Sequence, residues 1–156
     1  MRICGVDPGT NCGWSLLDAD KVVASGTWDL KPKRHEGGGM RYLRFDTLFN
    51  EVLAAGVDLV AYEEVRKHMG VDAAHVYGGI VAHVGSCCEA REPKVPYFGI
   101  PVGTIKKFAT GNGGAGKPEM IEAVFRRFGI TLLPSQDDEA DAIWIAACAE
   151  SQYGAK

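Results

Sequence analysis

The hydrophobic positions of this chain follow two different periods. Short apolar runs that end at turn residues predict strands, and apolar residues repeated every three to four positions predict helices. The expected strands are residues 2–7, 13–18 and 21–29, a fourth that ends at Glu63, and 95–98. The expected helices are residues 40–55, 71–90, one that begins at Pro101, 118–128 and 137–152.

The order of these elements predicts the fold class. Three early strands form an antiparallel meander, helices and strands then alternate, and helices close the chain. This order is typical of an α/β fold in which a mixed five-stranded sheet carries helices on both faces. With 156 residues, we expect one domain over 1–156.

Two of the predicted strands end at acidic residues. Asp7 ends the first strand and precedes the turn residues Pro8 and Gly9, whereas Glu63 and Glu64 end the fourth. If the two strands are neighbours, their acids meet at one edge of the sheet. Side chains alternate along a strand, so only one of Glu63 and Glu64 can point toward Asp7, and the pattern does not say which.

Two more acids, Asp138 and Asp141, lie one turn apart on one face of the last predicted helix. They can complete a cluster of four carboxylates with Asp7 and Glu63. Simpler explanations exist, because Asp7 suits a turn and Glu63 a surface strand end. Ser135 and Asp138 resemble a capping box, which is the favoured explanation for that helix alone. Asp141 is harder to explain, since its flank is partly apolar and an unpaired acid there is costly.

The charge of the chain gives a mixed picture. A formal charge of −3 and a pI near 5.8 argue mildly against nucleic acid, which rewards a basic surface. The bases are nevertheless grouped, in residues 31–35, 66–68, 106–107, 117 and 126–127. Such groups can surround an acidic site, and each alone is equally well explained as solvated surface charge.

Cysteine usage and hydropathy bear on location. The five cysteines are an odd number without Cys-x-x-Cys spacing, so neither a disulfide framework nor a zinc site is indicated. The N-terminus shows no basic and apolar leader, and no apolar run is long enough to span a membrane. We therefore expect a soluble protein of the cytoplasm, or of the host cytoplasm if the source is viral.

Four segments together resemble the RuvC-type Holliday junction resolvases, a family with the ribonuclease H-like fold. Gly5–Thr10 resembles the first-strand motif of the family, Ala61–Val65 its Ala-Ile-Glu-Gln-Val segment, and Asp138–Ala142 its C-terminal Asp-x-x-Asp-Ala. Ile105–Lys107 with Gly111–Lys117 is similar to its two-lysine stretch. Each motif alone is weak, but their order and separation also agree, and the likeness runs through nearly all of the chain.

The resemblance implies an endonuclease of DNA recombination and repair that cleaves four-way junctions by metal-assisted phosphodiester hydrolysis. It implies that one set of acids is both catalytic and metal-binding, namely Asp7, Glu63, Asp138 and Asp141. It also implies that Lys106 and Lys117 face branched DNA, and that a homodimer makes the paired nicks. The lysines can either stabilise charge at the phosphate or anchor the DNA backbone.

The residues fit this chemistry. Two Mg²⁺ or Mn²⁺ ions roughly 3.5–4 Å apart can activate water and stabilise the leaving oxygen. Hard cations prefer oxygen ligands, which four acids without neighbouring Cys or His supply. A junction presents two equivalent backbones, so a twofold dimer supplies two sites. The helix 71–90 is the candidate interface, although its apolar face can equally be buried within the monomer.

One position departs from the family pattern. Bacterial members carry an aromatic residue three places after the catalytic Glu, where this chain has Arg66. Arginine can stack on bases and contact phosphate, so Arg66 and its neighbour Lys67 are candidate DNA-binding residues. The sequence preference of the family is therefore not carried over, and we hypothesise a looser selection of branched DNA.

Other functions fit less well. The loop Gly111–Lys117 imitates a phosphate-binding P-loop, but Pro118 stands where that motif needs Ser or Thr. A related nuclease of ribosomal RNA precursors or of branched DNA in general, and a junction-binding protein without catalysis, are the alternatives. The two-lysine stretch and the terminal Asp-x-x-Asp favour the resolvase. An actin-like or sugar-kinase-like ATPase needs two domains, for which the chain has no room.

Overall fold

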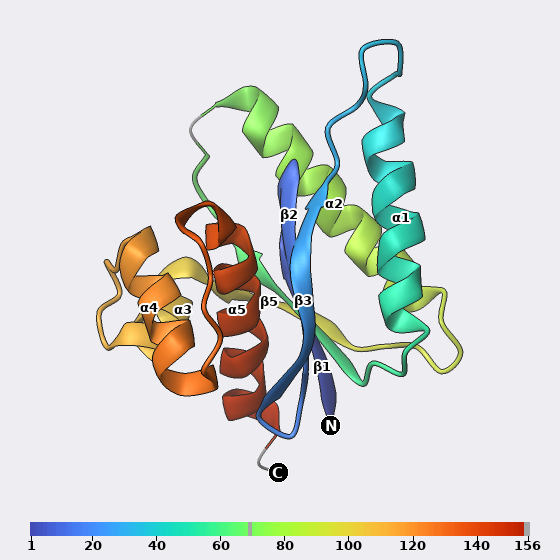
Figure 1. The fold of residues 1–156 in the computed structure, drawn as a ribbon. Helices are drawn as coiled ribbons and strands as arrows, with labels where there is room; N and C mark the ends of the chain where they lie inside the picture. Colours follow the sequence, from blue (N-terminus) through green and yellow to red (C-terminus); the bar gives the residue numbers. More distant parts are fainter. Residues whose placement is uncertain (69, 155–156) are drawn as a thin grey trace.

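The computed structural model describes residues 1–68 and 70–154 of the chain (Figure 1). The strands are β1 (Arg2–Asp7), β2 (Asn11–Asp18), β3 (Lys21–Asp29), β4 (Leu59–Glu64) and β5 (Tyr97–Pro101). The helices are α1 (Gly39–Leu53), α2 (Val71–Glu89), α3 (Val102–Thr110), α4 (Lys117–Phe128) and α5 (Asp137–Tyr153), with a short 3₁₀ turn η1 (Pro134–Gln136).

The strands form one mixed sheet in the order β3-β2-β1-β4-β5. The hairpins β1–β2 and β2–β3 are antiparallel, whereas β4 runs parallel to both β1 and β5. The predicted five-stranded α/β sheet is thus confirmed, and β1 and β4 are neighbours whose carboxyl ends lie at the same edge.

Helices cover both faces of the sheet, as the order of elements predicted (Figure 1). Side chains of α1 and α2 pack against one face around Phe45, Phe49 and Ile80. Helices α3, α4 and α5 contribute to the core on the other face, where α5 lies across β1 and β2. Residues alternate between these two cores along β1 and β4, so Ile3 of β1 belongs to one and Cys4 to the other.

Two strands have bounds that differ from the predicted ones. Strand β2 begins at Asn11 instead of residue 13, because Asn11 pairs with Asp29 of β3 and extends the ladder. Strand β5 covers 97–101 instead of 95–98, because Tyr97 is the residue that pairs with Val60. Both shifts depend on a distant strand, which a local pattern does not report.

The apolar face of α2 is buried within the chain. Ile80, Val84 and Cys88 are fully buried in the core shared with α1, so this face does not support α2 as a dimer interface. In the part of the chain that the structure describes, no helix is long and apolar enough to cross a membrane.

Candidate active site

Asp7 and Glu63 lie side by side at one edge of the sheet. In the parallel pair β1–β4, Val6 is opposite Tyr62. The next residues on the two strands are Asp7 and Glu63, so these acids are neighbours. Alternation along β4 decides between the two candidate glutamates. Tyr62 packs in the α1/α2 core, so Glu63 points toward the α5 face and Glu64 away from it.

Two glycines allow α5 to lie directly on the sheet. A Cβ atom at Gly13 would overlap the carbonyl group of Asp138, and one at Gly5 would overlap the carbonyl oxygen of Ala142. Gly13 is the register partner of Asp7. The backbone of the first turn of α5 therefore rests on the position next to Asp7, and this contact places Asp138 at the same edge of the sheet.

The four predicted acids influence one another electrostatically. Burial raises the pKa of Asp7 well above its usual value, and the charges of Glu63, Asp141 and Asp138 raise it further. Burial also raises the pKa of Asp141 to about 7, with further contributions from the nearby acids. Burial likewise raises the pKa of Glu63 and of Asp138. Mutual effects of this kind require that the carboxylates lie within short range of one another.

Two predicted lysines lie beside these acids. The ammonium group of Lys106 opposes the rise in the pKa of Glu63 and of Asp141, both of which burial dominates. Lys117 Nζ lies 3.1 Å from Asp137 Oδ2. A hydrogen bond from Lys117 to Asp137, together with the acid charges, raises the pKa of the lysine. The positive charges of α3 and α4 therefore face the acidic edge of the sheet.

The other two predicted DNA-binding residues lie on the loop that follows β4. Arg66 and Lys67 are exposed, and Arg66 Nε lies 3.8 Å from Glu64 Oε1. An exposed ion pair of this kind contributes little to stability. Both side chains are therefore free to contact a ligand close to the end of β4.

The donor set fits a hard divalent cation in its chemistry, because all four acids offer carboxylate oxygens. Their side chains do not form a ready ligand shell as they stand. Among residues 1–68 and 70–154, no three His, Cys, Asp or Glu side chains are grouped so that they could hold a metal ion. Beyond the effect of burial, the acids nevertheless lie close enough to raise the pKa of Asp7 and of Asp141. Metal binding would require their carboxyl groups to turn toward a shared ion.

The capping explanation for Asp138 is wrong. The N-cap of α5 is Gln136, and no side chain caps this helix, so Ser135 does not form a capping box with Asp138. The capping box found here belongs to η1, where Gln136 Oε1 accepts a hydrogen bond from the backbone N–H of Leu133. Asp138 is therefore left without the structural role that the local pattern favoured.

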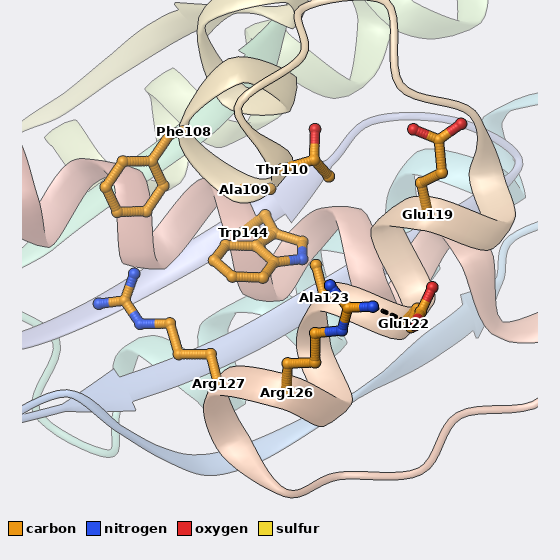
Figure 2. Close-up of a pocket in the computed structure, with 9 residues that line it drawn as sticks. All are labelled: Phe108, Ala109, Thr110, Glu119, Glu122, Ala123, Arg126, Arg127 and Trp144. Carbon is orange, nitrogen blue, oxygen red and sulfur yellow. Dashed lines mark hydrogen bonds and ion pairs between the residues drawn. The ribbon is translucent and has the colours of Figure 1, made fainter.

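A polar hollow of about 620 Å³ lies beside Asp138, between the start of α5 and the strands β2 and β3. A second pocket of about 440 Å³ lies between α3, α4 and α5 and contains none of the four acids (Figure 2). In it, Arg127 lies over the rings of Phe108, Phe128 and Trp144. We assign this second pocket to packing, because Arg127 is also paired with Asp20 at 2.8 Å.

The residues that support the acids were not predicted from the sequence. Gly5 and Asp7 share one face of β1, and Gly13 and Ser15 share the matching face of β2. Ser15 Oγ donates a 2.7 Å hydrogen bond to the carbonyl oxygen of Ala142. Small residues at every second position were the available signal, since they indicate a close backbone approach.

Comparison with known proteins identifies the family. The RuvC crossover junction endodeoxyribonuclease of Nocardia farcinica is 32% identical to this chain, over 95% of this chain and 80% of that protein. A RuvC of Mycobacterium sp. is 30% identical over 95% of this chain and 82% of its own length. The chain belongs to the RuvC family. No protein-family model matches it.

Solved structures support the same assignment. A structure titled T. thermophilus RuvC in complex with Holliday junction substrate has a TM-score of 0.81 and 25% identity, over 99% of this chain and 94% of that one. The fowlpox virus resolvase, at 13% identity and a TM-score of 0.64, shares the fold alone. The ribonuclease H-like fold predicted for this RuvC family member is confirmed.

Proposed function

We propose that this RuvC family member is a crossover junction endodeoxyribonuclease that cleaves Holliday junctions by metal-assisted phosphodiester hydrolysis. The observation that carries the proposal is the convergence of four carboxylates from β1, β4 and α5 at one edge of the sheet. The relatives named crossover junction endodeoxyribonuclease support the reaction, and the complex of T. thermophilus RuvC with a Holliday junction supports the substrate.

Asp7, Glu63, Asp138 and Asp141 would hold two Mg²⁺ or Mn²⁺ ions. When bound, the ions would supply charge stabilisation at the attacking and leaving oxygens. The chain itself contributes the geometry. The strands fix Asp7 and Glu63, and the glycine contact fixes Asp138. Because the backbone positions are fixed in this way, only the carboxyl side chains would have to turn when the ions bind.

Lys106 and Lys117 would contact the phosphates of the DNA. They are cations next to the acids, and Arg66 and Lys67 extend the positive surface from the end of β4. Phosphate contacts of this kind position the backbone and carry no sequence information.

Because a junction offers two equivalent strands, we propose that a homodimer provides paired active sites. We also propose that residues 1–156 form one nuclease domain and act in the cytoplasm, or in the host cytoplasm if the source is viral.

Cleavage of a synthetic four-way junction in Mg²⁺ tests the proposal, with the Asp7→Asn variant as the comparison. We expect wild-type cleavage and a loss of at least about 100-fold in the variant, since a metal supplies several kcal/mol of stabilisation. Burial and like charges disfavour ionised Asp7, so the uncharged Asn should fold at least as well. Wild-type inactivity on junctions over a range of Mg²⁺ and Mn²⁺ concentrations would contradict the proposal.

Arg66 bears on the choice of substrate. Where the family pattern has an aromatic residue, this chain has a charged side chain that is 81% exposed. We propose that the chain selects junction sequences loosely. Replacement of Arg66 by Phe should narrow cleavage to a subset of a panel of junction sequences, measured by mapping the cut positions. An unchanged cleavage pattern would count against this role.

A further inference from the structure

The first turn of α5 is held in an unusual way. It carries three successive acids, Asp137, Asp138 and Glu139, and no side chain caps it. The first N–H groups of a helix favour acids, but a missing cap normally leaves the end of a helix less well held. Besides the backbone contact with Gly13, a side-chain contact also holds this turn in place.

The side chain of Glu139 supplies that contact. Glu139 is only 9% exposed, and a buried carboxylate is costly unless its oxygens are hydrogen bonded. Ser25 Oγ of the edge strand β3 donates to Oε1 at 2.7 Å, and Gln136 Nε2 donates to Oε2 at 3.1 Å. Because Gln136 Oε1 accepts from the N–H of Leu133 at 2.6 Å, the network also fixes the chain that enters α5.

A second serine holds the next turn of the same helix. Ser25 is the register partner of Ser15 on β2, and Ser15 Oγ donates to the carbonyl oxygen of Ala142 at 2.7 Å. Glu139 and Ala142 are three residues apart and so lie on neighbouring positions of one helix face. Two adjacent serines of the sheet therefore hold two successive points of α5.

We propose that the Ser25–Glu139 hydrogen bond is a positioning device that holds Asp138 in place for metal binding. The inference rests on the proposed function, and it concerns a residue that does not itself bind metal. Both oxygens of Glu139 are engaged by Ser25 and Gln136, so they are directed away from Asp7. The bond to β3 holds the first turn against the repulsion among the four acids.

The test is a calorimetric titration of metal-free protein with Mn²⁺, together with the Mn²⁺ concentration that gives half-maximal junction cleavage. In Glu139→Ala, we expect the Mn²⁺ dissociation constant and the half-maximal Mn²⁺ concentration each to rise about 10-fold. This is in the range typical of the loss of a residue that supports a metal ligand. Maximal cleavage should return at saturating Mn²⁺, because Asp138 itself is intact. Glu122→Ala, which removes an exposed acid of α4, is the control for charge and should match the wild type.

The variant Glu139→Gln separates positioning from ligation. Its amide can accept from Gln136 and donate to Ser25, because a serine hydroxyl can serve as donor or acceptor. We expect Mn²⁺ affinity within about 2-fold of the wild type, since both hydrogen bonds are retained. Affinity as low as that of Glu139→Ala would overturn the proposal and indicate a role for the charge. Unchanged Mn²⁺ affinity in Glu139→Ala would overturn it as well.

Two further measurements keep the result unambiguous. If Glu139→Ala does not fold, Ser25→Ala removes one hydrogen bond from the opposite side and should weaken Mn²⁺ binding about 3- to 10-fold. Unchanged binding in folded Ser25→Ala would again overturn the proposal. If wild-type protein binds Mn²⁺ but does not cleave junctions, the proposed function fails, whereas the calorimetric comparison still tests the positioning role.

Discussion

The two faces of the sheet hold their helices by different means. On the α1/α2 face, side chains interlock, as in the stacked rings of Phe45 and Phe49 with centroids 5.0 Å apart. On the α5 face, helix backbone touches strand backbone at Gly5 and Gly13. Side chains can adjust to a small displacement, but two backbones in contact cannot.

This difference matches what each face has to do. The α1/α2 face buries apolar area, which depends weakly on small shifts in position. The α5 face must bring acids of a helix to acids of two strands, and catalytic constellations tolerate only about 0.5 Å of misplacement. Close backbone contact combined with the hydrogen bonds of Ser15 and Ser25 gives that precision.

Adding one methyl group on each side of the sheet is the strongest test of this difference. Gly13→Ala forces a Cβ into the backbone of Asp138, whereas the three atoms nearest to a Cβ at Gly79 all belong to the side chain of Tyr42 on α1. We expect Gly13→Ala to lower the free energy of unfolding by about 3 kcal/mol and Gly79→Ala by about 1 kcal/mol. Urea unfolding measures both, and equal losses would contradict the difference between the faces.

Neighbouring glutamates on opposite faces test the functional side of the comparison. Glu63→Gln should lower the rate of junction cleavage by about 100-fold or more, because it removes a proposed metal ligand. Glu64→Gln should change the rate by less than about 3-fold, because an exposed ion pair such as that with Arg66 is weak. The measurement is the rate of cleavage by each variant at saturating concentrations of Mg²⁺ and of junction DNA. A larger loss in Glu64→Gln would reverse the assignment made from strand alternation.

The pH dependence of stability is the smallest expected effect. Burial, with its neighbours, raises the pKa of Asp141 to about 7, so folded metal-free protein binds a proton there that unfolded protein releases at about pH 4. The free energy of unfolding should therefore fall as the pH rises from about 4 to 7. A pKa difference of about three corresponds to about 4 kcal/mol, and the partial exposure of Asp141 reduces the expected fall to on the order of 2 kcal/mol.

Urea unfolding at several pH values, with Asp141→Asn as the comparison, isolates this contribution. The free energy of unfolding should fall less with pH in Asp141→Asn, which has no proton to release at this position. Saturating Mn²⁺ should also reduce the fall in the wild type, because a cation favours the charged acids. An identical pH dependence in the two metal-free proteins would show that Asp141 is not the group responsible.

The sequence by itself determined the elements of this protein and the order of its acids. Strand alternation and helical repeats are local properties, so the ranges 2–7 and 21–29 are the same in the structure as in the prediction. The turn that follows Asp7 and the i, i+3 spacing of Asp138 and Asp141 are also local. These features predicted that the acids meet at one edge of the sheet if the two strands are neighbours, and β1 and β4 are neighbours.

Only the tertiary structure decided how that site is assembled. The choice of Glu63 over Glu64 depends on which core receives Tyr62, and the true cap of α5 excludes the role suggested for Ser135. The bond between Ser25 and Glu139 joins residues 114 positions apart in the chain. No local pattern reports such a contact, because it arises from the approach of a distant helix to the edge of a sheet.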